Sequence, residues 1–181
     1  MTNIIRTAVP EDIKAIRHVQ KITWLATYPN SDFGISVKDI ESKFPQENSP
    51  EEMTQIKRIA QRYQDKNTKT WVAENQDKTI IGFCVATKKQ DHNQISAIYV
   101  LPSQQRRGVG QLLMKKALDW FDSQKQVSLN VVSYNQNAIT FYHKFGFKKT
   151  GVQGSLDTAS QLPSGVILPE IEMKIEFSSA H

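Results

Sequence analysis

The feature that most constrains the fold is a predicted strand, a short glycine-containing turn and a predicted helix in direct succession. The apolar run 95–100 is typical of a strand. After the turn, apolar residues recur at helical spacing from Gly108 to about Ser123: Val109, Leu112, Leu113, Ala117, Trp120 and Phe121. A strand that leads into an amphipathic helix buries both apolar faces when the helix covers a sheet. The stretch therefore predicts an α/β fold.

The turn in this stretch is suited to holding an anion. It reads Gln105, Arg106, Arg107, Gly108, Val109 and Gly110. Glycines at a helix start remove side chains that would block an anion, while the unpaired N–H groups and the positive end of the helix dipole point toward it. A glycine here is also simply a way to turn the chain, so this stretch alone leaves both interpretations open. It lacks the P-loop lysine and the third glycine of the dinucleotide fingerprint, which disfavours nucleoside triphosphates and NAD.

A second stretch, 135–147, predicts a short helix that is closed at both ends. Asn135 is a favourable N-cap, and Gly146 can adopt the left-handed conformation that ends a helix. Ala138, Phe145 and either Phe141 or Tyr142 fall on one face. Tyr142 is therefore either a packed core ring or a placed phenol.

The remaining pattern predicts about seven strands in a mixed sheet with helices on both faces, in one domain over residues 1–181. Helices are expected at 10–26 and 51–64, the second with Met53, Ile56, Ile59, Ala60 and Tyr63 along one side. A loop with one short helix is expected within 29–50. The predicted strands are 4–8, 71–73, 80–86, 95–100, 127–131, 147–151 and 167–177.

The charge of the chain favours a polyanionic partner. The formal net charge is +5 and the sequence pI is about 9.3. Lysine and arginine occur in scattered pairs, such as Arg106–Arg107 and Lys148–Lys149, which disfavours nucleic acid and suits a small polyanionic cofactor.

The same composition disfavours several other classes of protein. Cys84 is the single cysteine and lies in an apolar run, so we expect an inert core residue. The sequence contains no Cys/His cluster at ligand spacing, so it predicts no metal site. No apolar run approaches the roughly 18 residues of a membrane span, and the first residues do not resemble a leader. These observations favour a cytoplasmic protein with no membrane partner.

Taken together, the two stretches resemble the GNAT superfamily of acetyl-CoA-dependent N-acetyltransferases. The family's phosphate motif, Gln or Arg followed by x-x-Gly-x-Gly or Ala, is matched from Gln105 to Gly110. Its later signature is matched by Asn135, Ala138, Tyr142, Gly146 and Phe147, and the Tyr-Val-x-Pro lead-in begins at Tyr99. These matches cover about residues 95–148. The order of elements extends the resemblance over nearly the whole chain, although before residue 67 it rests on that order alone.

The resemblance implies a GNAT fold with a V-shaped split between strands 4 and 5 that holds the pantetheine arm of acetyl-CoA. Backbone groups of Ile98 and Val100 are expected to pair with the arm. An N–H near Val100 would also polarise the thioester carbonyl. The pyrophosphate would meet N–H groups of Arg106, Arg107, Gly108, Val109, Gly110 and Gln111, next to Gln105, and Asn135 would help to hold the cofactor.

The resemblance also implies direct transfer of the acetyl group to an amine, with Tyr142 as the general acid that protonates the departing thiolate. A phenol suits this role because its ordinary pKa near 10 keeps it protonated at neutral pH. The base is open among Glu74, Tyr28, Glu172 and a water chain. Trp24, Tyr28 and Phe33 fall where the family's acceptor-side loop begins, so they either contact substrate or pack in the core.

The acceptor amine is not specified by these motifs. Residues 39–52 form an acidic segment with Asp39, Glu41, Glu47, Glu51 and Glu52 against Lys43 alone. This segment favours a cationic acceptor such as a polyamine, an aminoglycoside-like compound or a protein amine. It is equally typical of a solvated helix face. The alternative function is a GNAT module that binds acyl-CoA as a sensor without turnover, and the resemblance leaves room for a homodimer.

Overall fold

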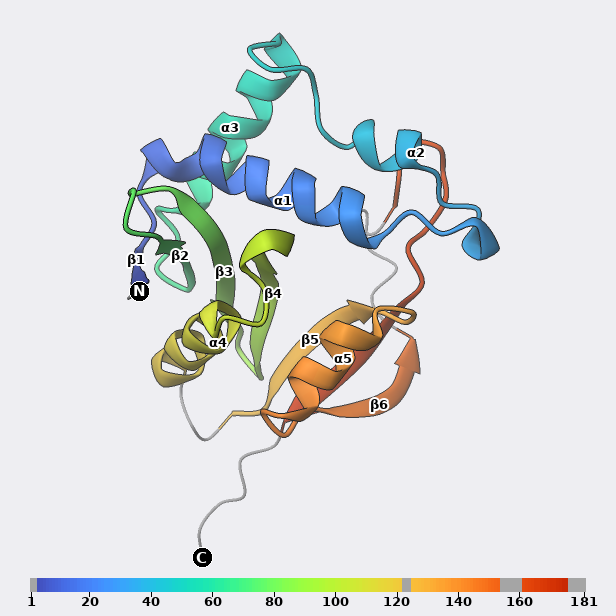
Figure 1. The fold of residues 1–181 in the computed structure, drawn as a ribbon. Helices are drawn as coiled ribbons and strands as arrows, with labels where there is room; N and C mark the ends of the chain where they lie inside the picture. Colours follow the sequence, from blue (N-terminus) through green and yellow to red (C-terminus); the bar gives the residue numbers. More distant parts are fainter. Residues whose placement is uncertain (1–2, 122–124, 154–160, 176–181) are drawn as a thin grey trace, which may run out of the picture.

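The chain forms a mixed seven-stranded sheet within the part that the structure, a computed structural model, describes: residues 3–121, 125–153 and 161–175. The strand order is β1-β2-β3-β4-β5-β7-β6 (Figure 1). The strands are β1 Ile4–Thr7, β2 Thr68–Glu74, β3 Ile80–Lys88, β4 Asn93–Val100, β5 Val127–Val132, β6 Lys148–Gln153 and β7 Glu170–Ile175. Only β4 and β5 pair in parallel, and the other neighbours are antiparallel.

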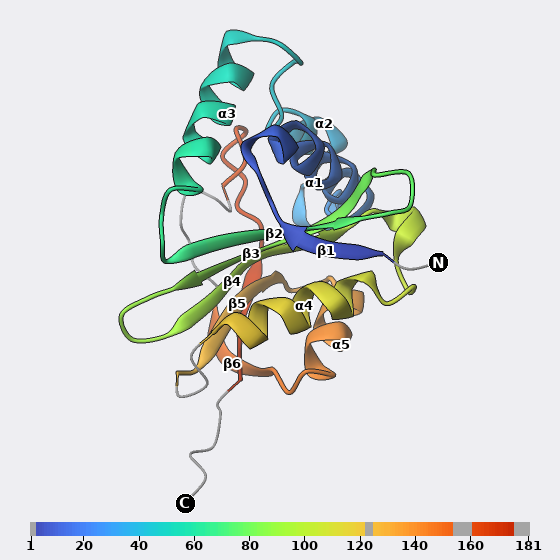
Figure 2. The ribbon, with the colours of Figure 1, turned by 90° about the vertical axis from the view of Figure 1, so that its left-hand side faces the viewer.

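Helices cover both faces of this sheet, as the sequence predicts. Figure 2 shows α1, α2 and α3 on one face, with α4 and α5 on the other. The helices are α1 Ile13–Thr27, α2 Val37–Glu41, α3 Pro50–Arg62, α4 Val109–Trp120 and α5 Gln136–His143. The predicted fold class, including the split between strands 4 and 5, is confirmed.

The split arises because β4 and β5 pair over only a short length. Their register runs from Asn93 opposite Val127 to Ile95 opposite Leu129 and then stops, although both strands continue. Figure 1 shows the two strands diverging from this point toward α1. The second halves of β4 and β5 therefore face each other across an opening, which we call the V.

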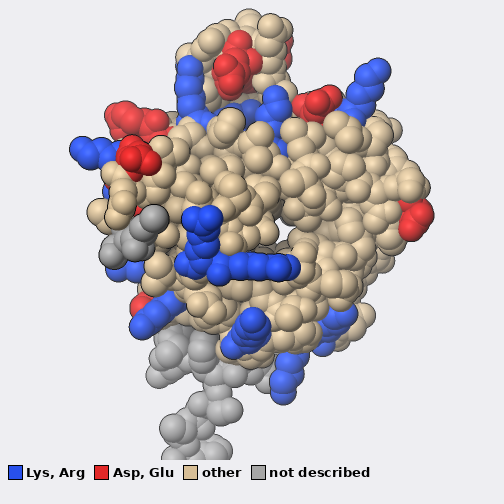
Figure 3. Space-filling view, in the orientation of Figure 1, with Lys and Arg blue, Asp and Glu red and all other residues tan. Residues whose placement is uncertain are grey.

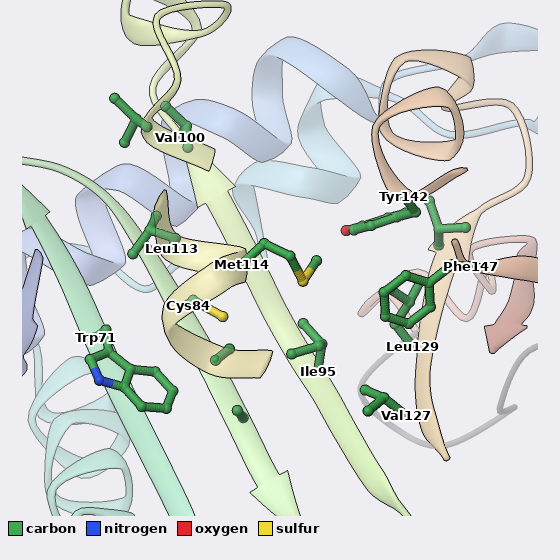
Figure 4. Close-up of a cluster of buried hydrophobic side chains, with 14 of the residues drawn as sticks. Trp71, Cys84, Ile95, Val100, Leu113, Met114, Val127, Leu129, Tyr142 and Phe147 are labelled. Atoms are coloured by element: carbon green, nitrogen blue, oxygen red, sulfur yellow. The ribbon is translucent and has the colours of Figure 1, made fainter. Parts of the chain in front are cut away.

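Two apolar layers hold the walls of the V in place. The layer under α4 and α5 contains Leu113, Met114, Leu129, Tyr142 and Phe147 (Figure 4). On the opposite face, α1 packs into two smaller clusters. Burial of each large apolar side chain contributes roughly 1.5–3 kcal/mol, so these layers fix the helices that carry the site.

On two helices, the apolar stripe that the sequence predicts is broader than the face that is buried in the structure. Met53 on α3 and Leu112 on α4 are 45% and 46% exposed, against the prediction for both. Hydrophobic periodicity predicts an apolar face, but the width of the contact depends on the neighbouring element. Helix α3 lies at one end of α1 rather than flat on the sheet (Figure 1), so its stripe is covered only in part.

The last strand begins later than predicted. Residue 167 is in an isolated bridge with Gln161, and β7 starts at Glu170, after Pro169. Proline has no N–H to donate to a strand ladder, and the Pro169 carbonyl instead accepts from the Ser133 N–H at 2.7 Å. Phe177, the predicted end of this strand, lies outside the described residues.

Candidate active site

The 105–110 turn has the backbone shape of an anion cradle. Arg106 and Gly108 both have positive φ, 61° and 84°, and Gly108 is the N-cap of α4. A Cβ built on Gly108 would meet nothing within 4 Å, so the turn is open on that side. The side chains of Arg106, Arg107 and Gln111 are exposed, whereas that of Val109 is buried, leaving Val109 only backbone groups to offer.

Two side-chain contacts tie this turn to the rest of the site. Gln105 Nε2 donates to the Val100 carbonyl oxygen at 3.1 Å, which joins the turn to the end of β4. Gly110 lies against α5, where an added Cβ would come within 3.4 Å of the Phe141 ring. Gly110 thus allows close packing between the two helices, and a ligand-facing role for its backbone is compatible with that packing.

Alternate residues at the end of β4 direct their backbone polar groups toward the V. The Leu101 N–H donates to the Ile81 carbonyl on the β3 side at 2.9 Å. Successive residues of a strand point their polar groups to opposite edges. Ile98 and Val100 therefore direct their N–H and C=O groups away from β3 toward the V, where they do not pair with β5. The Val100 carbonyl accepts from Gln105 instead.

Acetyl-CoA fits these residues, because the backbone of the splayed strand and the open turn supply hydrogen-bonding groups along one line. The β4 edge suits the amides of the pantetheine arm, and the start of α4 suits the pyrophosphate. Viewed as in Figure 1, the surface is hollowed near the middle, with long Lys or Arg side chains beside the hollow (Figure 3). Basic side chains there suit a polyanionic cofactor.

Helix α5 brings Asn135 and Tyr142 to the other wall of the V. Asn135 Oδ1 accepts from the Ala138 N–H at 3.1 Å, so its predicted capping role is confirmed. Gly146, at φ 88°, supplies the predicted left-handed end. Both helix ends are therefore set by local chemistry, and they fix the turn of helix that carries Tyr142.

Tyr142 is a buried ring with a hydroxyl group directed into the V. The residue is 7% exposed and packs against Phe141 and Phe147. Figure 4 shows the ring reaching from α5 toward β4, with its oxygen at the leading end. Burial raises the pKa of Tyr142 well above the ordinary value, with smaller contributions from Tyr99 and Cys84. A phenol with a raised pKa stays protonated at neutral pH and can donate a proton.

Aromatic residues from three segments close the α1 side of the V. Tyr28, the C-cap of α1, and Tyr99, on β4, have hydroxyl oxygens 3.3 Å apart. The Trp24 ring lies 5.0 Å from that of Tyr28 and 6.5 Å from that of Tyr99. Trp24 and Tyr28 are buried, while Phe33 is exposed and stacked on Tyr134. Of the three acceptor-side residues that the sequence names, Trp24 and Tyr28 are thus packed in the core, and Phe33 is exposed.

The candidate bases from the sequence do not all reach the V. Glu74 is bound to Arg6 at 2.9 Å on the β1–β2 side of the sheet. Glu172 pairs with Lys174 at 3.2 Å and accepts from Thr150 Oγ1 at 3.1 Å. Tyr28 does reach the V. The candidates chosen from the sequence did not include Tyr99, whose hydroxyl contacts that of Tyr28, or Glu170, whose charge raises the pKa of both phenols.

Several remaining residues have structural roles. Asp39 caps α2 by accepting from Ser36, and Glu52 is buried, accepting from the Asn48 N–H at 2.6 Å. Burial raises the pKa of Cys84, which fits an inert core thiol. His143 bonds the Phe147 carbonyl at 2.9 Å through Nδ1. No group of His, Cys, Asp or Glu among the described residues could hold a metal ion.

Comparison with known proteins identifies the family. The Acetyltransferase (GNAT) family matches residues 35–147. The chain is 32% identical over 81 residues to the peptidyl-lysine N-acetyltransferase YjaB of Escherichia coli, covering 45% of this chain and 50% of YjaB. The chain thus spans about half the length of the curated relatives that it matches, a group that includes the YjaB of Salmonella typhimurium.

Solved structures with low sequence identity share the fold. The PaiA N-acetyltransferase of Thermoplasma acidophilum, determined in complex with coenzyme A, aligns with a TM-score of 0.75 at 21% identity, covering 98% of this chain and all of PaiA. The E. coli ribosomal-protein-S18-alanine N-acetyltransferase aligns with a TM-score of 0.67 at 19% identity, covering 99% and 97%.

The chain belongs to the acetyltransferase (GNAT) family. The members of that family are acyltransferases that use acetyl-CoA as the acyl donor, and the open turn and splayed strand of this chain fit that donor. Among the residues that the structure describes, none of the helices is long and apolar enough to span a membrane.

Proposed function

We propose that the chain transfers the acetyl group of acetyl-CoA directly to a primary amine, with Tyr142 as general acid. One observation carries the proposal: the buried hydroxyl of Tyr142 points into the V at the place where pairing between β4 and β5 stops. A thioester carried along the β4 edge would bring its sulfur toward that hydroxyl. The departing thiolate would then take the proton of Tyr142.

The backbone would bind the donor in this proposal. Ile98 and Val100 would pair with the pantetheine arm. Donor groups of the turn and the start of α4 would meet the pyrophosphate, namely Gln105, Arg106, Arg107, Gly108, Val109, Gly110 and Gln111. Asn135 would hold the cofactor through the part of its side chain not used in capping. An N–H near Val100 would stabilise the oxyanion.

The acceptor we propose is a cationic primary amine, either of a small molecule such as a polyamine or of a protein. The matched relatives are named peptidyl-lysine N-acetyltransferases, which supports a lysine side chain. The acidic segment lends less support than its sequence suggests, because Asp39 and Glu52 serve helix ends and Glu52 is buried.

The test is a screen of primary amines for acetyl-CoA-dependent release of free thiol, with the acetylated product identified by mass spectrometry. Polyamines, lysine peptides and aminoglycosides form the panel. Thiol release that depends on one class of amine supports the proposal. Binding of acetyl-CoA with no transfer to any amine would favour the non-catalytic module instead.

A further inference from the structure

The α1 side of the V contains a fixed pair of hydroxyl groups. The Tyr28 and Tyr99 oxygens are 3.3 Å apart, within hydrogen-bond distance, although the residues are far apart in the sequence. Tyr134 Oη donates to the Tyr28 carbonyl oxygen at 2.6 Å, which anchors the backbone at the end of α1. The edge-on contact with Trp24 holds the Tyr28 ring. This pair therefore has little freedom to move away from the V.

Strand register brings a carboxylate to the same place. Glu170, the first residue of β7, is directly opposite Val132 on β5. Directly opposed residues of an antiparallel pair lie on the same face of the sheet. Val132 is buried in the cluster that contains Trp24 and Tyr28, with Tyr99 packed against it. Glu170 thus lies on the α1 face, at the open end of the V, and is half-buried.

The electrostatics of the two phenols agree with this placement. Burial raises the pKa of Tyr28 and of Tyr99, and the negative charge of Glu170 raises both further. Tyr142 is also close enough to raise the pKa of Tyr28. The proposed acid and the hydroxyl pair therefore share one electrostatic environment, with the Glu170 carboxylate as its fixed negative charge.

We propose that Glu170 and the Tyr28–Tyr99 hydroxyl pair form the ammonium-binding end of the acceptor site and remove the proton that the amine must lose before attack. The inference rests on the proposed function. A carboxylate on a partly buried face binds an ammonium group, and hydroxyl oxygens accept its N–H groups. The rings of Trp24 and Tyr28 add a surface that attracts a cation.

The proton balance of the reaction defines what this end must do. A primary ammonium loses two protons when it becomes an amide. The first would pass to a hydroxyl oxygen of the pair while the pair passes a proton to the Glu170 carboxylate, which later releases it to solvent. The free amine forms the C–N bond, the C–S bond breaks, and the thiolate takes a proton from Tyr142. The second nitrogen proton then restores Tyr142.

Glu172 provides a matched control on the same strand and the same face. It is opposite Asn130, pairs with Lys174 and accepts from Thr150. The variants Glu170→Gln and Glu172→Gln make the same chemical change two residues apart. Only the first removes the charge that acts on both phenols, so a difference between the two variants reports on the site rather than on strand stability.

The binding test uses the whole chain saturated with coenzyme A, titrated with n-butylammonium and, for comparison, n-butanol. Tryptophan fluorescence or calorimetry follows binding. We expect the ammonium to bind more tightly than the alcohol, and Glu170→Gln to weaken its binding about 10- to 100-fold, the range for one charged hydrogen bond. Glu172→Gln should leave the affinity nearly unchanged. Equal affinity in wild type and Glu170→Gln, or no preference for the ammonium, overturns the inference.

The kinetic test uses the primary amine that wild type acetylates best. Glu170→Gln should raise KM for that amine, and Glu170→Asp should restore part of the loss. Tyr28→Phe combined with Tyr99→Phe should lower kcat more than it changes KM. Unchanged constants in all three variants contradict the proposed roles.

The two tests distinguish this inference from the proposed function. If ammonium binding depends on Glu170 but no amine is acetylated, the proposed function is contradicted and the ammonium site is supported. If an amine is acetylated equally well by wild type and Glu170→Gln, the proposed function is supported and the role of Glu170 is contradicted. The thermal shift with acetyl-CoA should be the same in every variant, which shows that the donor half remains intact.

Discussion

The two halves of the V are built in different ways. The proposed donor half consists mainly of backbone groups from one continuous strand–turn–helix unit, β4 to α4. The proposed acceptor half consists of side chains from α1, β4 and β7, which come to one face only when the sheet forms. A site of backbone groups depends on a local conformation, whereas a site of side chains depends on tertiary register. Substitutions in the donor half and in the acceptor half should therefore be detected by different measurements.

The largest expected effect separates chemistry from donor binding. Tyr142→Phe keeps the ring that packs against Phe141 and Phe147 but removes the proton donor. We expect kcat to fall about 10²- to 10⁴-fold, the usual range for general acid catalysis. The affinity for acetyl-CoA, measured by calorimetry, should hardly change. A variant with the turnover of wild type would show that the thiolate leaves without help from Tyr142.

The next effect is specific to the donor half. Acetyl-CoA at a hundredfold excess over Kd should stabilise the fold by about 2.7 kcal/mol, or roughly 5–10 °C in Tm for a chain of this size. Gly108→Val should remove most of this shift, because φ is 84° at the open face of the turn.

Gly151 is the matched control for that experiment. It has a similar φ of 79° and equally open surroundings, but it lies on β6 at the far edge of the sheet. Gly151→Val should lower Tm by backbone strain yet keep the shift with acetyl-CoA. Loss of the shift in both variants would point to general destabilisation instead of a role for the turn.

A smaller effect tests the buried phenols around the V through alkaline pH. The folded-state pKa values of Tyr28, Tyr99 and Tyr142 are raised by burial. Their contribution to stability is present below the unfolded pKa of about 10 and is lost as pH rises above it. Each such phenol steepens the decline by about 1.4 kcal/mol per pH unit.

Urea unfolding at pH values from about 9 to about 11, which lie on both sides of the ordinary phenol pKa, measures this decline in stability. Tyr99→Phe and Tyr142→Phe should each reduce the slope by about one such increment. Replacement of Tyr134, where burial raises the pKa to about 12, should act in the same direction over a narrower range. An unchanged slope in the Tyr142 variant would mean that its hydroxyl is exposed to water in the folded state.

The sequence predicts the helix ends around the V well because their geometry depends on residue type. Gly108 and Gly146 adopt the positive φ values that only glycine adopts readily, and Asn135 caps its helix through a contact three residues away. Such local requirements are visible in a single sequence.

The acceptor half could not be predicted in the same way. Glu170 lies on the face that carries Tyr28 and Tyr99 because β7 inserts between β5 and β6, an order that no local pattern encodes. The exposure of Met53 and Leu112 has the same origin. A hydrophobic period shows that a face is apolar, but what covers that face is decided by packing between distant segments.

The smallest expected effect compares the acidic segment with the carboxylate in the acceptor half. Glu47 and Glu51 are exposed, and Glu47 lies in a cavity wall beside Lys14 and Lys21, which offset its charge. Exposed ion pairs contribute as little as about 0.2 kcal/mol each, or about 0.4 kcal/mol for two such charges, so Glu47→Gln with Glu51→Gln should raise KM for a cationic amine only about twofold. Because exposed charges are screened over about 8 Å at physiological ionic strength, added salt should imitate the double variant and leave kcat unchanged.

Glu170→Gln should instead raise KM further and with little salt dependence, since its charge is partly buried. If the double variant has the larger effect, the acceptor is attracted by the surface field and not held by the carboxylate in the V.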